Sequence, residues 1–374
     1  MTQVASARGA TERDSREIIG VQYLRGVAAL LVVFDHSATI IALPEYFNGV
    51  LYNGMLNYGS MGVDLFFVIS GFIITIVSLQ ARSTAPRVSL YEYARRRIAR
   101  IIPFLWVCVA VYASVRLLGR GKFEWGPYLN AVFLLPPGEV RPNVVWTLRH
   151  EALFYIVFAL SFLGTRRRLW ILGLWVFSPL MLLLFLNHPL RCGYWCSLSQ
   201  FAFSPVNLEF AFGVMAGVCY LKYDRIRNLL STQSLPWASV LACIVITQYL
   251  AAVFFRLSER SVLSALLLGA LSTLALAAAL PAPAPRSSIS RIGKTLGDAS
   301  YAIYLVHNLV LLIWYSLWIK LLGKSHPYAA QITGVIIAVI LATIVHRYVE
   351  RPLVKAAQQI GRHKALVPDA ESAV

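Results

Sequence analysis

The stretch GSMGVDLFFVISGFIITIVSL, residues 59–79, decides the fold class. Asp64 is the only charged residue in it. A helix needs about 20 mostly apolar residues to cross the hydrocarbon core of a bilayer. The stretch therefore predicts a membrane-spanning helix.

Composition extends this prediction to the whole chain. Of its 374 residues, 58% are hydrophobic and 14% are charged, whereas soluble proteins usually carry roughly 25% charged residues. A soluble enzyme and a disordered chain are excluded, and five cysteines are too few for a disulfide scaffold. We predict an all-α fold, a polytopic membrane helix bundle of about ten transmembrane helices. The predicted spans are 21–43, 59–79, 101–118, 144–163, 169–186, 201–221, 237–255, 261–281, 299–321 and 329–349.

Most of the charges lie between these apolar runs. The net charge of +17 would suggest a nucleic-acid partner in a soluble protein. One set of connections holds 23 Lys and Arg and the opposite set holds 9. Because cytoplasmic loops carry the excess of basic residues, we predict that both termini are cytoplasmic and that nucleic acid is no partner. The predicted division is a cytoplasmic tail at 1–17, a transmembrane domain at 18–352 and a cytoplasmic tail at 353–374.

Five ionisable residues fall within or at the edge of predicted spans: Arg25, His36, Asp64, Glu151 and His307. Such residues are costly in a bilayer and usually line a cavity. At 1.5 Å rise per residue, His36 lies about 16 Å beyond Arg25. The span boundaries place Asp64 and Glu151 near the depth of His36. An imidazole and carboxylates at one depth predict a general acid/base centre.

These residues also have simpler explanations. An intramembrane histidine such as His36 often forms only a hydrogen bond between helices. Asp64 and Glu151 are equally open to structural roles, and His307 is open to pairing with a tyrosine about one turn away. A proton relay in a proton-coupled secondary transporter, using the buried His, Asp and Glu, is the alternative from another functional class.

A basic segment precedes the third span. It ends in Arg95-Arg96-Arg97-Ile98-Ala99-Arg100, and ordinary anchoring on the cytoplasmic side explains such a segment. However, Arg97 and Arg100 are three residues apart on one helix face and suit a phosphate or diphosphate group. Both interpretations stay open at this point.

Metal and cysteine chemistry has little support. No P-loop, dinucleotide-binding glycine pattern or HExxH motif occurs. Cys192 and Cys196 lie in a predicted outward loop with His188, a spacing open to a disulfide or, less readily, to a metal. We predict no metal.

Five motifs, in order along the chain, resemble those of the acyltransferase-3 family of membrane acyltransferases. Arg25 and His36 resemble the family's Arg and His separated by ten residues. Residues 62–72 are similar to its second-span signature, and residues 97–103 to its basic motif. Residues 146–155 resemble its Trp-Ser-Leu plus Glu pattern, with Thr147 in place of Ser, and residues 301–307 resemble its late span with Tyr and His.

The family's members O-acylate surface polysaccharides, peptidoglycan or secondary metabolites, and this chain most resembles the exopolysaccharide and lipopolysaccharide O-acetyltransferases. The resemblance implies a multi-pass O-acyltransferase of the bacterial inner membrane that uses cytoplasmic acetyl-CoA as donor. The expected acceptor is a hydroxyl of a lipid-linked or nascent surface glycan. Membrane lipids are the other expected partner.

The resemblance also assigns roles to single residues. His36 is expected to be the general base or a transient acyl carrier, with Asp64 or Glu151 orienting it or balancing its charge. The expected donor-binding residues are Arg25, Arg97 and Arg100. The expected substrate-binding residues are Trp146, Tyr304 and His307.

Overall fold

The computed structural model describes residues 18–360, except 82, 84, 121–123, 137, 161, 163–166, 187–196, 226–227, 229–236 and 256–260. The predicted N-terminal tail and residues 361–374 of the predicted C-terminal tail lie outside the described residues. So do His188, Cys192 and Cys196, the candidates for a disulfide or metal. Across these residues the chain is helical, with an isolated bridge between Leu79 and Pro86 as its sole β pairing. The predicted all-α fold is confirmed.

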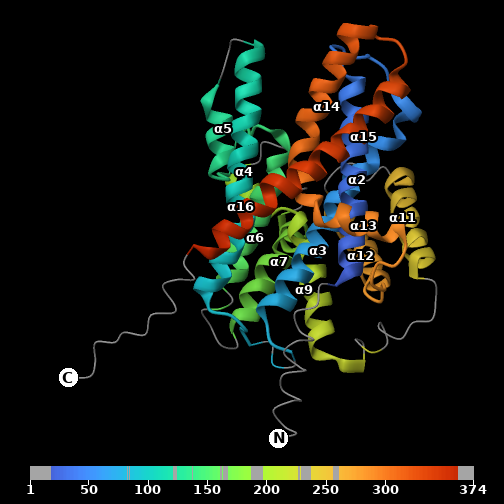
Figure 1. Ribbon diagram of the computed structural model, residues 1–374. Coiled ribbons are helices and arrows are strands. Elements are labelled where there is room, and N and C mark those ends of the chain that lie inside the picture. The colour runs from blue at the N-terminus through green and yellow to red at the C-terminus, as the bar shows by residue number, and fades with distance from the viewer. Residues whose placement is uncertain are drawn as a thin grey trace, which may run out of the picture.

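The helices form an elongated bundle (Figure 1). In chain order they are α2 (Ile19–Ala42), the 3-10 helix η1 (Leu51–Ser60), α3 (Met61–Ser78), α4 (Leu90–Arg120), α5 (Trp125–Val132), the 3-10 helix η2 (Asn143–Val145), α6 (Trp146–Leu160), α7 (Arg167–Leu186), α8 (Leu198–Ala202), α9 (Val206–Lys222), α11 (Trp237–Phe254), α12 (Val262–Ala279), α13 (Ser288–Asp298), α14 (Ser300–Leu322), α15 (Pro327–Val345), the π-helix η3 (His346–Glu350) and α16 (Arg351–Gln359). In Figure 1, α4 and α5 lie to one side of the bundle and α11 to the other.

Each of the ten predicted runs is a helix, and seven segments of the described chain are long and apolar enough to cross a membrane. They are Ile19–Ala42, Leu51–Ser78, Leu90–Gly119, Leu198–Lys222, Val262–Ala279, Ser300–Leu322 and Pro327–Gln359. The other three runs are α6, α7 and α11, of which α6 has 15 residues. The protein is therefore a multi-pass membrane protein.

Helix α3 packs closely against two neighbours because glycine removes the side chain at each crossing. A methyl group on Gly62 would lie 2.4 Å from the carbonyl oxygen of Ala28 in α2. A methyl group on Gly71 would lie 2.3 Å from the carbonyl oxygen of Phe210 in α9. Such close backbone approach is how membrane helices pack without large apolar side chains. It makes α3 the centre of the bundle.

Two segments that lie between predicted spans are built into the bundle. Helix η1 continues directly into α3, so that Leu51–Ser78 forms one candidate span of 28 residues. Between α4 and α6, the side chains of Tyr128, Ala131, Val140 and Val144 are buried in the largest apolar cluster. Residues that follow these segments therefore lie deeper in the protein than the predicted span boundaries place them.

Candidate active site

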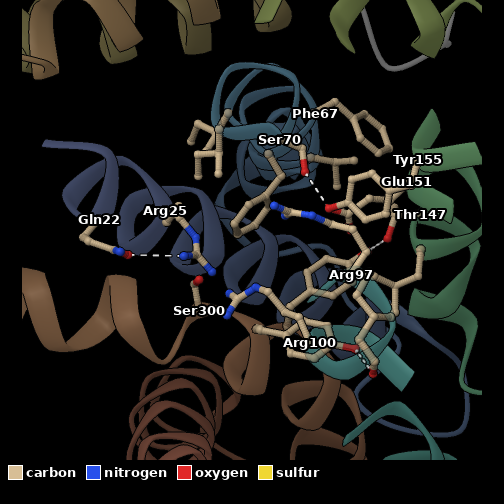
Figure 2. A pocket seen from close by; sticks show the side chains of 18 residues that line it. Gln22, Arg25, Phe67, Ser70, Arg97, Arg100, Thr147, Glu151, Tyr155 and Ser300 are labelled. Atoms are coloured by element: carbon tan, nitrogen blue, oxygen red, sulfur yellow. Dashed lines mark hydrogen bonds between the residues drawn. The ribbon is translucent and has the colours of Figure 1, made fainter. Parts of the chain in front are cut away.

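The main candidate site is a cavity of about 330 Å³ among α2, α3, α4, α6 and α14 (Figure 2). We call it the arginine cavity. Its polar lining residues are Gln22, Arg25, Ser70, Arg97, Arg100, Thr147, Glu151, Tyr155, Ser300, Tyr301 and Tyr304. Its apolar lining residues are Val63, Phe66, Phe67, Ile69, Ile73, Ile101 and Leu148.

All three predicted donor-binding arginines line this cavity. Figure 2 shows Arg25, Arg97 and Arg100 directed into the same space, from α2 and α4. Arg25 donates one hydrogen bond to Gln22 Oε1, at 3.3 Å. The guanidinium of Arg97 lies over the ring of Tyr155, 5.6 Å from its centroid, and its Nε is buried without a hydrogen-bond partner. Among the described residues none of the three forms an ion pair, so the site is suited to an anion.

Neighbouring arginines on α4 have a different environment. Arg95 and Arg96 form ion pairs with Glu92 at 2.7 and 2.6 Å. The helix thus divides its basic segment into two faces, one neutralised by Glu92 and one facing the cavity. The spacing of Arg97 and Arg100 had predicted a shared face, and both side chains do line the same cavity.

Glu151 is the carboxylate that lines the cavity. It accepts a hydrogen bond from Ser70 Oγ, with Oγ to Oε1 at 2.5 Å, and another from the Tyr155 hydroxyl. The backbone oxygen of Tyr155 in turn accepts a hydrogen bond from the Tyr93 hydroxyl at 2.9 Å. These contacts tie α3, α4 and α6 together around the carboxylate. The cavity therefore holds three guanidinium groups and one carboxylate.

The second cluster is formed by His36 and His307, which we call the histidine pair. Their ring centroids are 5.0 Å apart in an edge-to-face arrangement. Nδ1 of His36 lies 3.0 Å from the carbonyl oxygen of Val32, and Nδ1 of His307 lies 2.8 Å from that of Ile303. A carbonyl only accepts hydrogen bonds, so each Nδ1 carries the proton and each Nε2 is a base. The His307 Nε2 is buried without a partner.

The carboxylate beside His36 is Asp35, at 3.8 Å from Nδ1, and not Asp64 or Glu151. The sequence-based expectation that His36, Asp64 and Glu151 lie at one depth is therefore corrected. Gly59 packs on Leu31 and Gly62 on Ala28, so α3 runs antiparallel to α2.

Extending that register places Asp64 roughly 15 Å inward of His36. Glu151, bonded to Ser70, lies deeper still. The error has a physical cause, since η1 and the buried segment before α6 lengthen the path that precedes both carboxylates. Asp64 lies in the first turn of α3, where the helix dipole favours a negative charge.

The predicted substrate-binding residues fall in different places. Tyr304 lines the cavity, and its hydroxyl lies 2.7 Å from Thr147 Oγ1 and donates to the Val144 carbonyl oxygen at 3.0 Å. Its ring centroid is 6.2 Å from that of His307. Trp146 packs against His150, with ring centroids 5.8 Å apart, and does not line the cavity. Tyr304 is thus the residue that connects the arginine cavity to the histidine pair.

Sequence reasoning missed several lining residues, notably Ser70 and Tyr155. Tyr155 is four residues after Glu151, a spacing that puts both on one helix face, so a search for i, i+4 partners would have found it. Ser70 bonds to a residue 81 positions away, and no local pattern predicts that contact. In the part of the chain that the structure describes, no three His, Cys, Asp or Glu side chains gather as metal ligands.

Comparisons with known proteins add independent evidence. The profile of a family described as "Acyltransferase domain" matches residues 18–347. The chain is 32% identical, over 79% of its length, to the exopolysaccharide production protein ExoZ of Rhizobium meliloti (strain 1021), of which 90% is covered. It is 25% identical, over 92% of its length, to the acyltransferase MdmB of Streptomyces mycarofaciens, of which 94% is covered.

A shorter match links the chain to the O-acetyltransferase OatA of Staphylococcus aureus (strain NCTC 8325 / PS 47). The two are 26% identical over 28% of this chain and 20% of OatA. No solved structure matches the chain.

Proposed function

Because the chain belongs to the acyltransferase-3 family, we propose that this membrane acyltransferase moves an acetyl group from cytoplasmic acetyl-CoA to a hydroxyl of a surface or exported glycan. The observation that carries the proposal is the arginine cavity, in which three guanidinium groups converge with no ion-pair partner among the described residues. The three side chains are half-buried, and cations partly withdrawn from water are stabilised by a counter-charge, which the phosphates of CoA supply in this proposal.

The donor lies along the cavity in this proposal. Arg25, Arg97 and Arg100 hold the phosphates at the end predicted to face the cytoplasm. The pantetheine arm extends outward toward Tyr304, which brings the thioester to the side of the cavity nearest the histidine pair. No metal takes part.

The chemical step uses His36 as a general base. Its Nε2 removes the proton of the acceptor hydroxyl as the oxygen attacks the thioester carbonyl carbon. The carbon–sulfur bond then breaks, and the thiolate of CoA leaves with the proton that His36 returns. The hydrogen bond from Nδ1 to Val32 fixes the tautomer that this role requires. His307, edge-on to the His36 ring, holds that ring in place.

The acceptor is proposed from the relatives. One is named for exopolysaccharide production and another is an O-acetyltransferase, which favours a glycan hydroxyl on a lipid carrier or a growing chain. A bacterial inner membrane is the compartment in which cytoplasmic acetyl-CoA and such an acceptor meet.

The test combines a cell-based and a purified assay. A deletion strain should lose O-acetyl signals from its surface glycan by NMR, and wild-type protein should restore them while His36→Ala does not. The purified protein should release CoA thiol from acetyl-CoA when its acceptor lipid fraction is added. Proton-coupled solute uptake in vesicles without thiol release would replace the proposal with a secondary transporter.

A further inference from the structure

The two ends of the arginine cavity differ in chemistry. At one end lie the three guanidinium groups, with Gln22 and Ser300. At the other end the walls are Val63, Phe66, Leu148, Thr147 and Tyr304, and the hydroxyls of the last two bond to each other and to the Val144 carbonyl oxygen. The order of residues along α3 and α14 supports this division, because Val63 and Phe66 precede Ser70 on α3 while Tyr304 follows Ser300 on the antiparallel path. The cavity therefore has a charged end and an apolar end.

The apolar end is closed toward the histidine pair by two rings. The centroid of Phe66 lies 6.0 Å from that of Tyr304, in an edge-to-face contact. Tyr304 lies 6.2 Å from His307, and His307 lies 5.0 Å from His36. Phe66 and Tyr304 thus form a partition between the cavity and the proposed base. An acyl group attached to a donor in the cavity meets this partition first.

The two rings are held in unequal ways. The hydroxyl of Tyr304 is fixed by Thr147 and the Val144 carbonyl oxygen, both from the α6 side. Phe66 is partly buried and packs against the three largest apolar clusters, with no polar anchor. The position of Tyr304 is therefore set by directional hydrogen bonds, whereas the space at Phe66 is set by the volume of its own ring.

We propose that Phe66 limits the size of the acyl group, so that the apolar end of the cavity accepts acetyl and excludes longer chains. The inference rests on the proposed use of acyl-CoA and extends it to the choice of acyl chain. With the phosphates at the arginines, the acyl carbons lie against Phe66, and each added methylene competes with the ring for the same space. Removing the ring leaves an apolar space that longer chains fill.

The expected size of the effect follows from hydrophobic burial. Each methylene that becomes buried strengthens binding by about fourfold, and one misfitted methylene in a pocket costs roughly tenfold or more. Butyryl-CoA should therefore bind wild-type protein at least tenfold more weakly than acetyl-CoA does. In Phe66→Ala the order should reverse or the gap should close.

The experiment measures dissociation constants of CoA, acetyl-CoA, butyryl-CoA and hexanoyl-CoA on the purified full chain. Variants are Phe66→Ala, the milder Phe66→Leu, and the control Ile76→Ala, which loosens packing on the same helix outside the cavity. Phe66→Ala should bring butyryl-CoA to the affinity of acetyl-CoA, Phe66→Leu should fall between, and Ile76→Ala should keep the wild-type gap.

Three results would overturn the inference, and they differ from one another. An unchanged gap in both Phe66 variants would remove Phe66 as the determinant while leaving acyl-CoA binding intact. Equal closing of the gap in Ile76→Ala would assign the effect to general loosening of α3. Wild-type protein that binds none of the four thiol compounds would remove the proposed donor itself, and the inference with it.

Discussion

The arginine cavity and the histidine pair are separated by the rings of Phe66 and Tyr304, yet they are built differently. The cavity holds three cations and one carboxylate, and its cations have no ion-pair partner among the described residues. The histidine pair holds two imidazole rings, each with its Nδ1 held by a backbone carbonyl oxygen. A surplus of fixed charge suits binding of an anion, whereas a fixed tautomer suits proton transfer. The bundle thus separates a cavity suited to an anion from a histidine pair suited to proton transfer.

The sharpest test of that separation is His36→Ala. Loss of a general base lowers turnover by about 10²–10⁴-fold, while the affinity for CoA should stay within about twofold because His36 does not line the cavity. Turnover and the dissociation constant of CoA are measured on the same purified protein. The control is His326→Asn, at an exposed left-handed position that asparagine tolerates. Near-normal turnover in His36→Ala would contradict the general-base role and indicate that His36 only packs between helices.

Arg97→Ala and Arg100→Ala test the other side of the comparison. A charge-assisted contact to phosphate contributes about 1.5–3 kcal/mol, so the affinity for CoA should fall roughly tenfold or more in each variant. Binding of a phosphate-free pantetheine thioester should change little. Lysine at these positions should restore only part of the affinity, because it lacks the planar fork of arginine.

The matched control for this prediction is Arg96→Ala, one residue away on the same helix. Its guanidinium is paired with Glu92, at 2.6 Å, and does not line the cavity. It should leave CoA affinity within about twofold, since exposed ion pairs contribute little. Equal losses of CoA affinity in Arg96→Ala and Arg97→Ala would indicate that the basic segment serves only to anchor the helix at the cytoplasmic side of the membrane.

How far the sequence predicted these features depends on whether a feature is local. Arg97 and Arg100 are three residues apart, and helical geometry alone puts them on one face. The contact of His36 with His307 joins positions far apart in the chain, so only the packing of α2 against α14 creates it. Both histidines were candidates from their burial in apolar runs, but nothing in the spacing paired them.

Depth was the feature that the sequence predicted wrongly. A hydropathy pattern marks apolar runs but gives no information about segments that fold back into the bundle. The segment before α6 buries Tyr128 and Val144, and η1 extends α3. Both insertions move the carboxylates inward, which is why Glu151 bonds to Ser70 instead of lying beside His36.

Glu151→Gln tests that corrected placement. The amide oxygen still accepts hydrogen bonds from Ser70 and Tyr155, but the negative charge in the cavity is lost. Like-charge repulsion of a bound phosphate is worth about 1 kcal/mol or more at short range, so CoA should bind roughly fivefold more tightly. The pH profile of turnover should keep its position, because His36 has another carboxylate, Asp35, beside it. A shifted pH profile with unchanged CoA affinity would instead indicate that Glu151 interacts with the histidine pair.

The smallest expected effect concerns Tyr155, which supports the cavity through Arg97. The guanidinium lies 5.6 Å from the ring centroid, and a cation over an aromatic face contributes about 0.5–1 kcal/mol at exposed sites and more when desolvated. Tyr155→Phe keeps the ring and loses only the hydroxyl that bonds to Glu151, so CoA affinity should stay within about twofold.

Tyr155→Leu removes the ring as well and should weaken CoA binding roughly threefold to fivefold. Turnover at saturating donor should be unchanged in both variants, since neither touches the histidine pair. The measurement is the dissociation constant of CoA together with turnover at saturation and melting temperature. If phenylalanine and leucine weaken binding equally, the hydroxyl and its bond to Glu151 position Arg97, and the ring does not. If both leave binding unchanged, Arg97 holds its orientation without Tyr155, and the cavity's geometry is set by the packing of α4 alone.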